Sequence, residues 1–190
     1  IEVVPFSYTI DGVEYIPERE FDGKAFSAAM RAGSEVKTSM VNAGTFIERF
    51  KAALDAGKDV LYIGMSGGIS GTANAALMAK QELYEEYPDM KIIDNETHAA
   101  SLGEGLFVIK AAEQLKDGAA LDKIEEDIRA QVPSMCQSFT VGDLKYLKNT
   151  GRVSGAAAII GNVLSRHPIL IGDYEGKIVV KAKVRGMKRT

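Results

Sequence analysis

The 190-residue sequence contains no tryptophan, a single cysteine and only two histidines. That cysteine, Cys136, has no partner for a disulfide within the chain, which fits a reducing cytoplasm. Its neighbourhood contains neither a helix N-terminus nor a basic cluster, so we expect a buried structural thiol rather than a reactive one. No apolar run approaches the roughly 20 residues that a membrane-spanning helix needs, and no signal peptide is visible. These absences favour a cytoplasmic protein without a membrane-spanning segment.

A strong charge of either sign is also missing. The net charge of −3 provides no general basic field, so nucleic acid is not expected as a partner. With 46% hydrophobic and 26% charged residues, the composition is ordinary for a soluble globular protein. Because the sequence starts inside the apolar run IEVVPF and stops where a strand should turn, we expect it to be a piece of a longer protein.

The pattern of apolar residues predicts an α/β fold. Strands are predicted at 58–65, 90–94 and 137–141, and the first is apolar almost throughout, as in strands buried on both faces of a parallel sheet. Helices are predicted between and after them, and this alternation is typical of a parallel sheet with right-handed crossovers. We therefore predict a parallel-sheet α/β domain over residues 1–144. A second α+β domain, incomplete in this chain, is predicted over residues 145–190.

Shorter signals predict local structure. The dipeptide Asp-Gly at 11–12 lies between alternating residues and predicts a hairpin turn. The segment 22–33 predicts a helix that ends on a glycine. Thr45 and Glu48 have the spacing of a capping box at the start of the next helix. The helix predicted over 101–118 carries apolar residues on two adjoining stripes, so we expect it to be well buried.

The stretch YIGMSGGISGTANAA, residues 62–76, ends a strand and begins a helix. In open parallel sheets, ligands bind beyond the carboxyl ends of the strands. The first turn of a helix offers free N–H groups and a positive dipole end, and both attract anions. Ser66, Ser70 and Thr72 add hydroxyl donors there without adding charge. The turn is therefore suited to a carboxylate, although Ser70 could also serve only as the cap of the helix.

Two other functions fit parts of the same turn. The segment 64–68 matches the G-x-S-x-G elbow of serine hydrolases. The triad of such a hydrolase would consist of Ser66, Asp94 and either His98 or His167. A P-loop for nucleotides is not predicted, because the required lysine is missing. The phosphate of a small phosphorylated metabolite remains an alternative ligand.

Two further clusters carry groups that bind anions. Thr38 and Ser39 place a second pair of hydroxyls in a linker. Arg152 lies between Gly151 and Gly155, where a guanidinium can reach a carboxylate or phosphate through two parallel hydrogen bonds. The plainer alternatives are a solvated loop for the first cluster and a surface or ion-paired arginine for the second.

The motifs VVPFSYTIDGVEY, KTS, SGGISGT, KIIDNET, LKYLKNTGRVSG, HPIL and KVRG occur in this order along nearly the whole chain. This set resembles the DegV family of bacterial fatty-acid-binding proteins. The resemblance implies an α/β domain related to one in dihydroxyacetone kinases and a second α+β domain, with a long-chain fatty acid such as palmitate between or within them. It also implies lipid binding without catalysis, because a separate fatty acid kinase phosphorylates the bound acid in fatty acid metabolism. Neither a cofactor nor a metal is expected.

Carried over residue by residue, the resemblance implies Thr38 or Ser39 together with Ser70 as head-group binders. Arg152 would lie near the head group or help the kinase to dock. With the rest of the glycine turn, the predicted fatty-acid-binding residues are Thr38, Ser39, Ser66, Gly68, Ser70, Gly71, Thr72 and Arg152. The apolar stripe over 156–164 is predicted to line a tunnel for the acyl chain.

Overall fold

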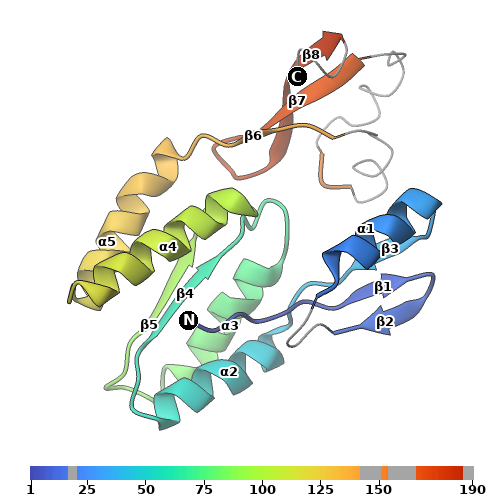
Figure 1. The fold of residues 1–190 in the computed structure, drawn as a ribbon. Helices are drawn as coiled ribbons and strands as arrows, with labels where there is room; N and C mark the ends of the chain where they lie inside the picture. The colour runs from blue at the N-terminus through green and yellow to red at the C-terminus, as the bar shows by residue number, and fades with distance from the viewer. Residues whose placement is uncertain (17–20, 142–150, 154–165, 186–190) are drawn as a thin grey trace. The chain divides into compact units, whose positions relative to one another are not determined.

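The computed structural model describes residues 1–16, 21–141, 151–153 and 166–185 (Figure 1). The chain forms two compact units, a first unit of Ile1–Val60 with Asn74–Ile92 and a second unit of Leu61–Ala73 with Ile93–Thr190. The fold is mixed α/β, as predicted, and the described residues form one parallel pair of strands and two antiparallel sheets. The division into domains at residues 144 and 145 stays a prediction.

The first unit begins with a three-stranded antiparallel sheet. Its strands are β1 (Tyr8–Ile10), β2 (Val13–Tyr15) and β3 (Val36–Thr38), in the order β2-β1-β3. Asp11 and Gly12 both have positive φ, at 49° and 84°, as a two-residue type I′ hairpin turn requires. The hairpin predicted at this dipeptide is therefore confirmed.

Helix α1 (Gly23–Ala32) confirms the helix predicted over 22–33. The Asp22 carboxylate accepts hydrogen bonds from the N–H groups of Lys24 and Ala25, and Gly33 ends the helix in the left-handed conformation at φ 99°. Four aromatic rings of this unit pack at centroid distances of 5.1–5.8 Å, from Tyr8, Tyr15, Phe21 and Phe26. They join the sheet to the helix.

Helix α2 (Ala43–Asp55) has Asn42 as its N-cap, whose side-chain oxygen accepts from Thr45 N–H at 2.9 Å. The capping box predicted from Thr45 and Glu48 is thus wrong, because the helix starts two residues before Thr45. Phe46, Phe50 and Leu54 are buried at helical spacing on one face. Helix α3 (Thr72–Leu83) buries Ala75, Ala76, Ala79 and Leu83.

Strands β4 (Val60–Gly64) and β5 (Ile92–Glu96) form the parallel pair. Val60 N–H donates to Lys91 O at 2.8 Å, and Thr97 N–H donates to Gly64 O at 3.1 Å. Partners thus advance in the same direction along both strands, as in a parallel ladder. The carboxyl ends of β4 and β5 therefore meet at one edge, where the glycine turn begins.

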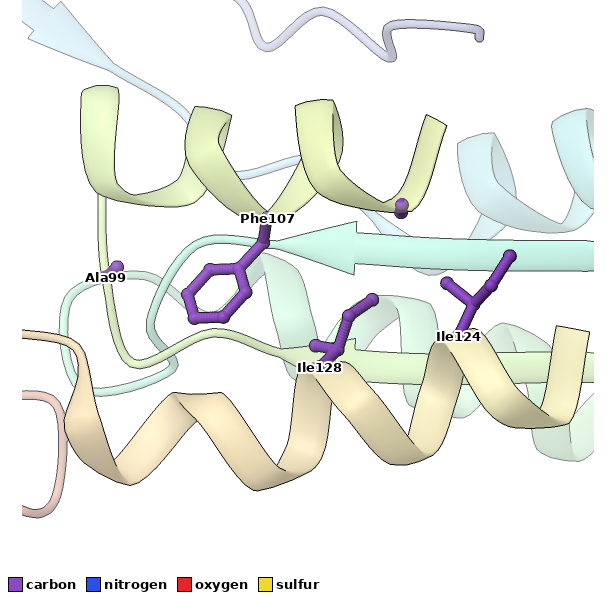
Figure 2. Close-up of a cluster of buried hydrophobic side chains, with 5 residues drawn as sticks. Ala99, Phe107, Ile124 and Ile128 are labelled. Atoms are coloured by element: carbon purple, nitrogen blue, oxygen red, sulfur yellow. The ribbon is translucent and has the colours of Figure 1, made fainter. Parts of the chain in front are cut away.

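Helices α4 (Leu102–Lys116) and α5 (Leu121–Gln131) pack on this strand pair within the second unit. Their shared core contains Ala99, Phe107, Ala111, Ile124 and Ile128, with Leu61 and Ile63 of β4 packed against it. Figure 2 shows the Phe107 ring and the two isoleucines pointing into the space between the helices and the strands. This core supports the edge from which the glycine turn leaves.

The expectation that α4 is well buried is wrong. Its buried residues are Gly103, Phe107 and Ala111, which form one narrow stripe. Leu102 is 84% exposed and Leu106 is 52% exposed, so the predicted apolar stripe that contains them faces away from the core of the unit. A helix with apolar residues on two sides can be buried on both sides only if other helices or strands pack against each of them.

A second antiparallel sheet has the order β6-β7-β8, from β6 (Ser138–Phe139), β7 (Arg166–Gly172) and β8 (Ile178–Arg185). Strands β7 and β8 form an antiparallel hairpin, with Gly172 opposite Ile178. Strand β6 was predicted as the third parallel strand, but it pairs antiparallel with β7, Ser138 opposite Ile171. That prediction is wrong because periodicity identifies a strand without identifying its partner.

Cys136 follows the short 3-10 helix η1 (Val132–Ser134) and is exposed. The expectation of a buried thiol is therefore wrong. The preceding residue, Met135, packs against the core of α4 and α5. Successive side chains in an extended segment point in opposite directions, which leaves Cys136 on the outside.

Candidate functional site

The candidate site is the turn that joins β4 to α3, residues 65–71, with the first residue of the helix. Ile69 N–H and Ser70 N–H both donate to Ser66 O, at 3.0 and 3.1 Å, so the turn is tight. The hydroxyls of Ser70 and Thr72 share a hydrogen bond of 2.9 Å. Ser70 Oγ also accepts from Thr72 N–H at 3.3 Å. Both side chains are partly buried at the N-terminal end of a helix of 12 residues.

This pairing leaves a donor that can serve a ligand. When Thr72 donates its proton to Ser70 Oγ, the Ser70 proton is available to a further acceptor. A carboxylate oxygen is such an acceptor, and the positive end of the α3 dipole favours it. Gly71 lies between the two hydroxyls and is exposed, so no side chain covers the approach at that position.

Ser66 has a different environment from Ser70. It is fully buried, and its hydroxyl donates to Gly176 O at 2.7 Å and accepts from Gly68 N–H at 3.1 Å. Among the described residues, no histidine makes a hydrogen bond to Ser66 Oγ, and His98 instead lies 3.4 Å from Glu96 Oε1. A nucleophile needs a base on its proton and a path for the substrate. In the described ranges, Ser66 is buried and its hydroxyl is bonded to a backbone carbonyl instead of a base.

Glu96, which the sequence patterns did not single out, binds the same turn. Gly67 N–H donates to Glu96 Oε1 at 2.7 Å, and a Cβ at position 67 would lie 2.9 Å from the same carboxylate. Glycine at 67 therefore lets the Glu96 carboxylate approach the turn this closely, whereas a larger residue would make that side chain shift. Glu96 is the last residue of β5, and the carboxyl end of the neighbouring parallel strand is the signal that could have identified it.

Carboxylates lie near Tyr62 on β4, the strand that leads into the turn. Burial raises the pKa of Tyr62 on β4, and the carboxylates of Asp94, Glu104 and Glu96 raise it further. Burial also raises the pKa of Glu104. Tyr62 therefore stays neutral at physiological pH. The Glu96 carboxylate at the turn opposes a multiply charged anion more than a singly charged one.

Arg152 is exposed, and the structure places its neighbour Val153 in a core cluster of the second unit. Val153 forms a parallel bridge with Ile178, and the cluster of Val153, Leu170 and Ile178 also packs against Ile69. Val153, next to Arg152, and Ile69, next to Ser70, thus pack in one cluster. The structure brings these two predicted segments together.

Thr38 and Ser39 lie in the first unit. Thr38 ends β3 opposite Tyr8, and Ser39 N–H donates to Ser7 O at 2.9 Å. Both side chains are exposed. Their convergence with Ser70 on one ligand stays a prediction, and the predicted tunnel stripe over 156–164 lies outside the described residues.

In the described part of the chain, no group of three or more histidine, cysteine, aspartate or glutamate side chains is arranged to hold a metal ion. None of the helices in the same ranges has the length and apolar character to cross a membrane.

The model of the family described as "Uncharacterised protein, DegV family" matches residues 1–190, the whole chain. The chain belongs to the DegV family. A DegV domain-containing protein of Clostridium perfringens is 40% identical over 183 residues, which cover 95% of this chain and 63% of the relative. One from Lactococcus lactis is 36% identical over 176 residues, or 93% of this chain and 61% of the relative. The chain thus spans less than two thirds of the length of these DegV relatives.

Two solved DegV structures share the fold. The fatty acid binding DegV family protein of Streptococcus agalactiae superposes with a TM-score of 0.85 at 31% identity, over 98% of this chain and 65% of that protein. A DegV family protein of Thermus thermophilus, described by its fatty acid binding, gives a TM-score of 0.82 at 30% identity, over 98% and 65%.

Proposed function

We propose that the protein binds a long-chain fatty acid noncovalently and holds its carboxylate at the Ser70–Thr72 turn. The observation that carries the proposal is the pair of hydroxyls, 2.9 Å apart, at the N-terminal end of α3. Uncharged donors and a helix dipole suit a single negative charge that must be held without being attacked. The fatty acid binding of the DegV proteins from S. agalactiae and T. thermophilus supports the same ligand class.

The acyl chain supplies most of the affinity in this proposal. Burying a 16-carbon chain is worth roughly 0.8 kcal/mol per methylene, or about ten kcal/mol before the costs of association. The head group then needs only modest contacts to orient the lipid. Such contacts leave the carboxylate accessible for transfer to another protein.

The protein is proposed as a carrier and not as a catalyst. Ser66, the nucleophile of the rival hydrolase, is buried and bonded to a backbone carbonyl. A separate fatty acid kinase in the cytoplasm is proposed to phosphorylate the bound acid, with exposed Arg152 near the head group or at the docking surface. A phosphorylated metabolite is less suited to the turn, because Glu96 would repel a dianion more than a monoanion.

Native mass spectrometry of the protein as purified from cells tests the proposal. The expected result is an added mass equal to that of a fatty acid, released on denaturation. A sugar phosphate in its place, or a protein that stays empty after incubation with palmitate, would overturn the proposal. Labelling by a fluorophosphonate distinguishes a serine hydrolase from a carrier. A catalytic Ser66 would react with this reagent, whereas a buried Ser66 hydroxyl would not.

A further inference from the structure

The turn between β7 and β8 is held directly against the candidate site, although 110 positions separate the two in sequence. The contact is the buried bond from Ser66 Oγ to Gly176 O at 2.7 Å. Ser66 Oγ in turn accepts from Gly68 N–H at 3.1 Å. One hydroxyl therefore joins two backbone segments, and all three residues belong to the second unit.

Both glycines are required by this contact. A Cβ at position 68 would lie 2.6 Å from Gly176 C and 2.7 Å from Glu175 O, closer than side-chain atoms approach backbone. A Cβ at position 176 would lie 1.9 Å from Ser66 Oγ, and Gly176 also has φ +70°, which favours glycine. Packing against the hairpin thus explains the glycine at position 68 independently of any ligand.

The contact continues toward the proposed head-group donor. Ile69 packs against the cluster of Val153, Leu170 and Ile178, so sheet β7–β8 determines the position of the side chain next to Ser70. Ser70 N–H donates to Ser66 O at 3.1 Å. Ser66 therefore contacts the hairpin through its hydroxyl and Ser70 through its carbonyl.

We propose that Ser66, Gly68 and Gly176 are positioning residues that hold the Ser70 hydroxyl in place for the head group. The β7–β8 hairpin then controls the recognition of the carboxylate without touching it. This inference rests on the proposed function and deepens it. It assigns to Ser66 and Gly68 a role through Ser70, in place of the direct contact with the fatty acid expected from the sequence.

The inference predicts a loss of head-group discrimination that a general loss of stability does not cause. We would measure the affinity for palmitate and for hexadecanol, which has the same chain length and no charge, by titration calorimetry. For Ser66→Ala we expect palmitate affinity to fall about 5- to 30-fold and hexadecanol affinity to fall less than about twofold. Gly176→Ala should give the same pattern, because the added methyl displaces the Ser66 hydroxyl.

A matched control is Thr140→Val. Thr140 Oγ1 also donates to a backbone carbonyl of the hairpin, Pro168 O at 2.7 Å, and this bond joins β7 to the end of β6 instead of to the glycine turn. Thr140→Val should lower the midpoint of urea unfolding and leave the ratio of the two affinities unchanged. If Ser66→Ala does not fold, Ser66→Cys keeps the shape of the side chain and a weak donor, and it should give an intermediate ratio.

The outcomes separate the inference from the proposed function. If the wild-type protein binds neither ligand, the proposed function fails. If it prefers palmitate and a folded Ser66 variant keeps the same preference, the positioning role is overturned while the proposed function stands. If Thr140→Val loses as much preference for palmitate over hexadecanol as Ser66→Ala does, the positioning role is also overturned, because lower stability alone would then explain the loss.

Discussion

Replacing Ser70 with alanine removes the hydroxyl proposed to donate to the carboxylate. A hydrogen bond to a charged acceptor contributes about 1.5–3 kcal/mol, and solvent at a partly buried site lowers the bottom of this range to about 1 kcal/mol. We therefore expect the dissociation constant for palmitate to rise about 5- to 150-fold. The same change removes the acceptor for Thr72 N–H, a capping loss of about 0.5–2 kcal/mol. Because that bond is long, at 3.3 Å, we expect the lower end.

Two measurements separate these effects. Titration calorimetry with palmitate reports binding, and urea denaturation without ligand reports the capping loss, which affects the free and bound protein alike. Ser134→Ala is the matched control, because the Ser134 hydroxyl donates to Gln131 O at 2.8 Å beyond the end of α5, far along the chain from the turn. An unchanged dissociation constant in Ser70→Ala would refute the assignment of Ser70 as a head-group donor.

Phe107→Ala should lower the free energy of unfolding in urea by about 3–5 kcal/mol, because the ring fills the centre of a buried cluster. Leu106→Ala, at an exposed position, should cost under about 1 kcal/mol, and equal losses would contradict the core described above. Glu96→Gln keeps an acceptor for the Gly67 amide but removes a negative charge, so palmitate should bind about two- to fivefold more tightly. This gain in affinity should be smaller in about 0.5 M salt, because salt screens the charge. Weaker binding in low salt would argue against a head group at this turn. Arg152→Ala should slow phosphorylation of the bound acid by a fatty acid kinase more than it weakens binding, and equal losses in the two assays would count against a docking role.

The relation of Ser66 to Ser70 changes how the glycine turn is interpreted. In the sequence, the two serines belong to one anion-binding motif. In the structure, Ser66 is buried against Gly176, whereas Ser70 pairs with Thr72 at the start of α3. The first half of the turn therefore serves tertiary packing, and the second half is the part that we propose binds the ligand. Glycine at 67 and 68 is explained by Glu96 and by Gly176, respectively.

The sequence by itself determined the local structure of this protein. The turn at Asp11 and Gly12 and the two ends of α1 follow from contacts between residues a few positions apart, where the chemistry of each side chain decides the backbone. The order of strands and helices, and the position of the candidate site beyond the end of β4, follow from the same short-range patterns. The family resemblance rested on such segments as well.

Only the tertiary structure decided which partners these segments have. Strand β6 pairs with β7, Leu102 on α4 is exposed, and Ser66 binds a carbonyl 110 positions away. Each outcome depends on groups that are distant in sequence, and local sequence patterns do not specify such partners. The reason is physical: a buried hydroxyl or an apolar face is stabilised by whatever packs against it, and the folded chain alone specifies that partner.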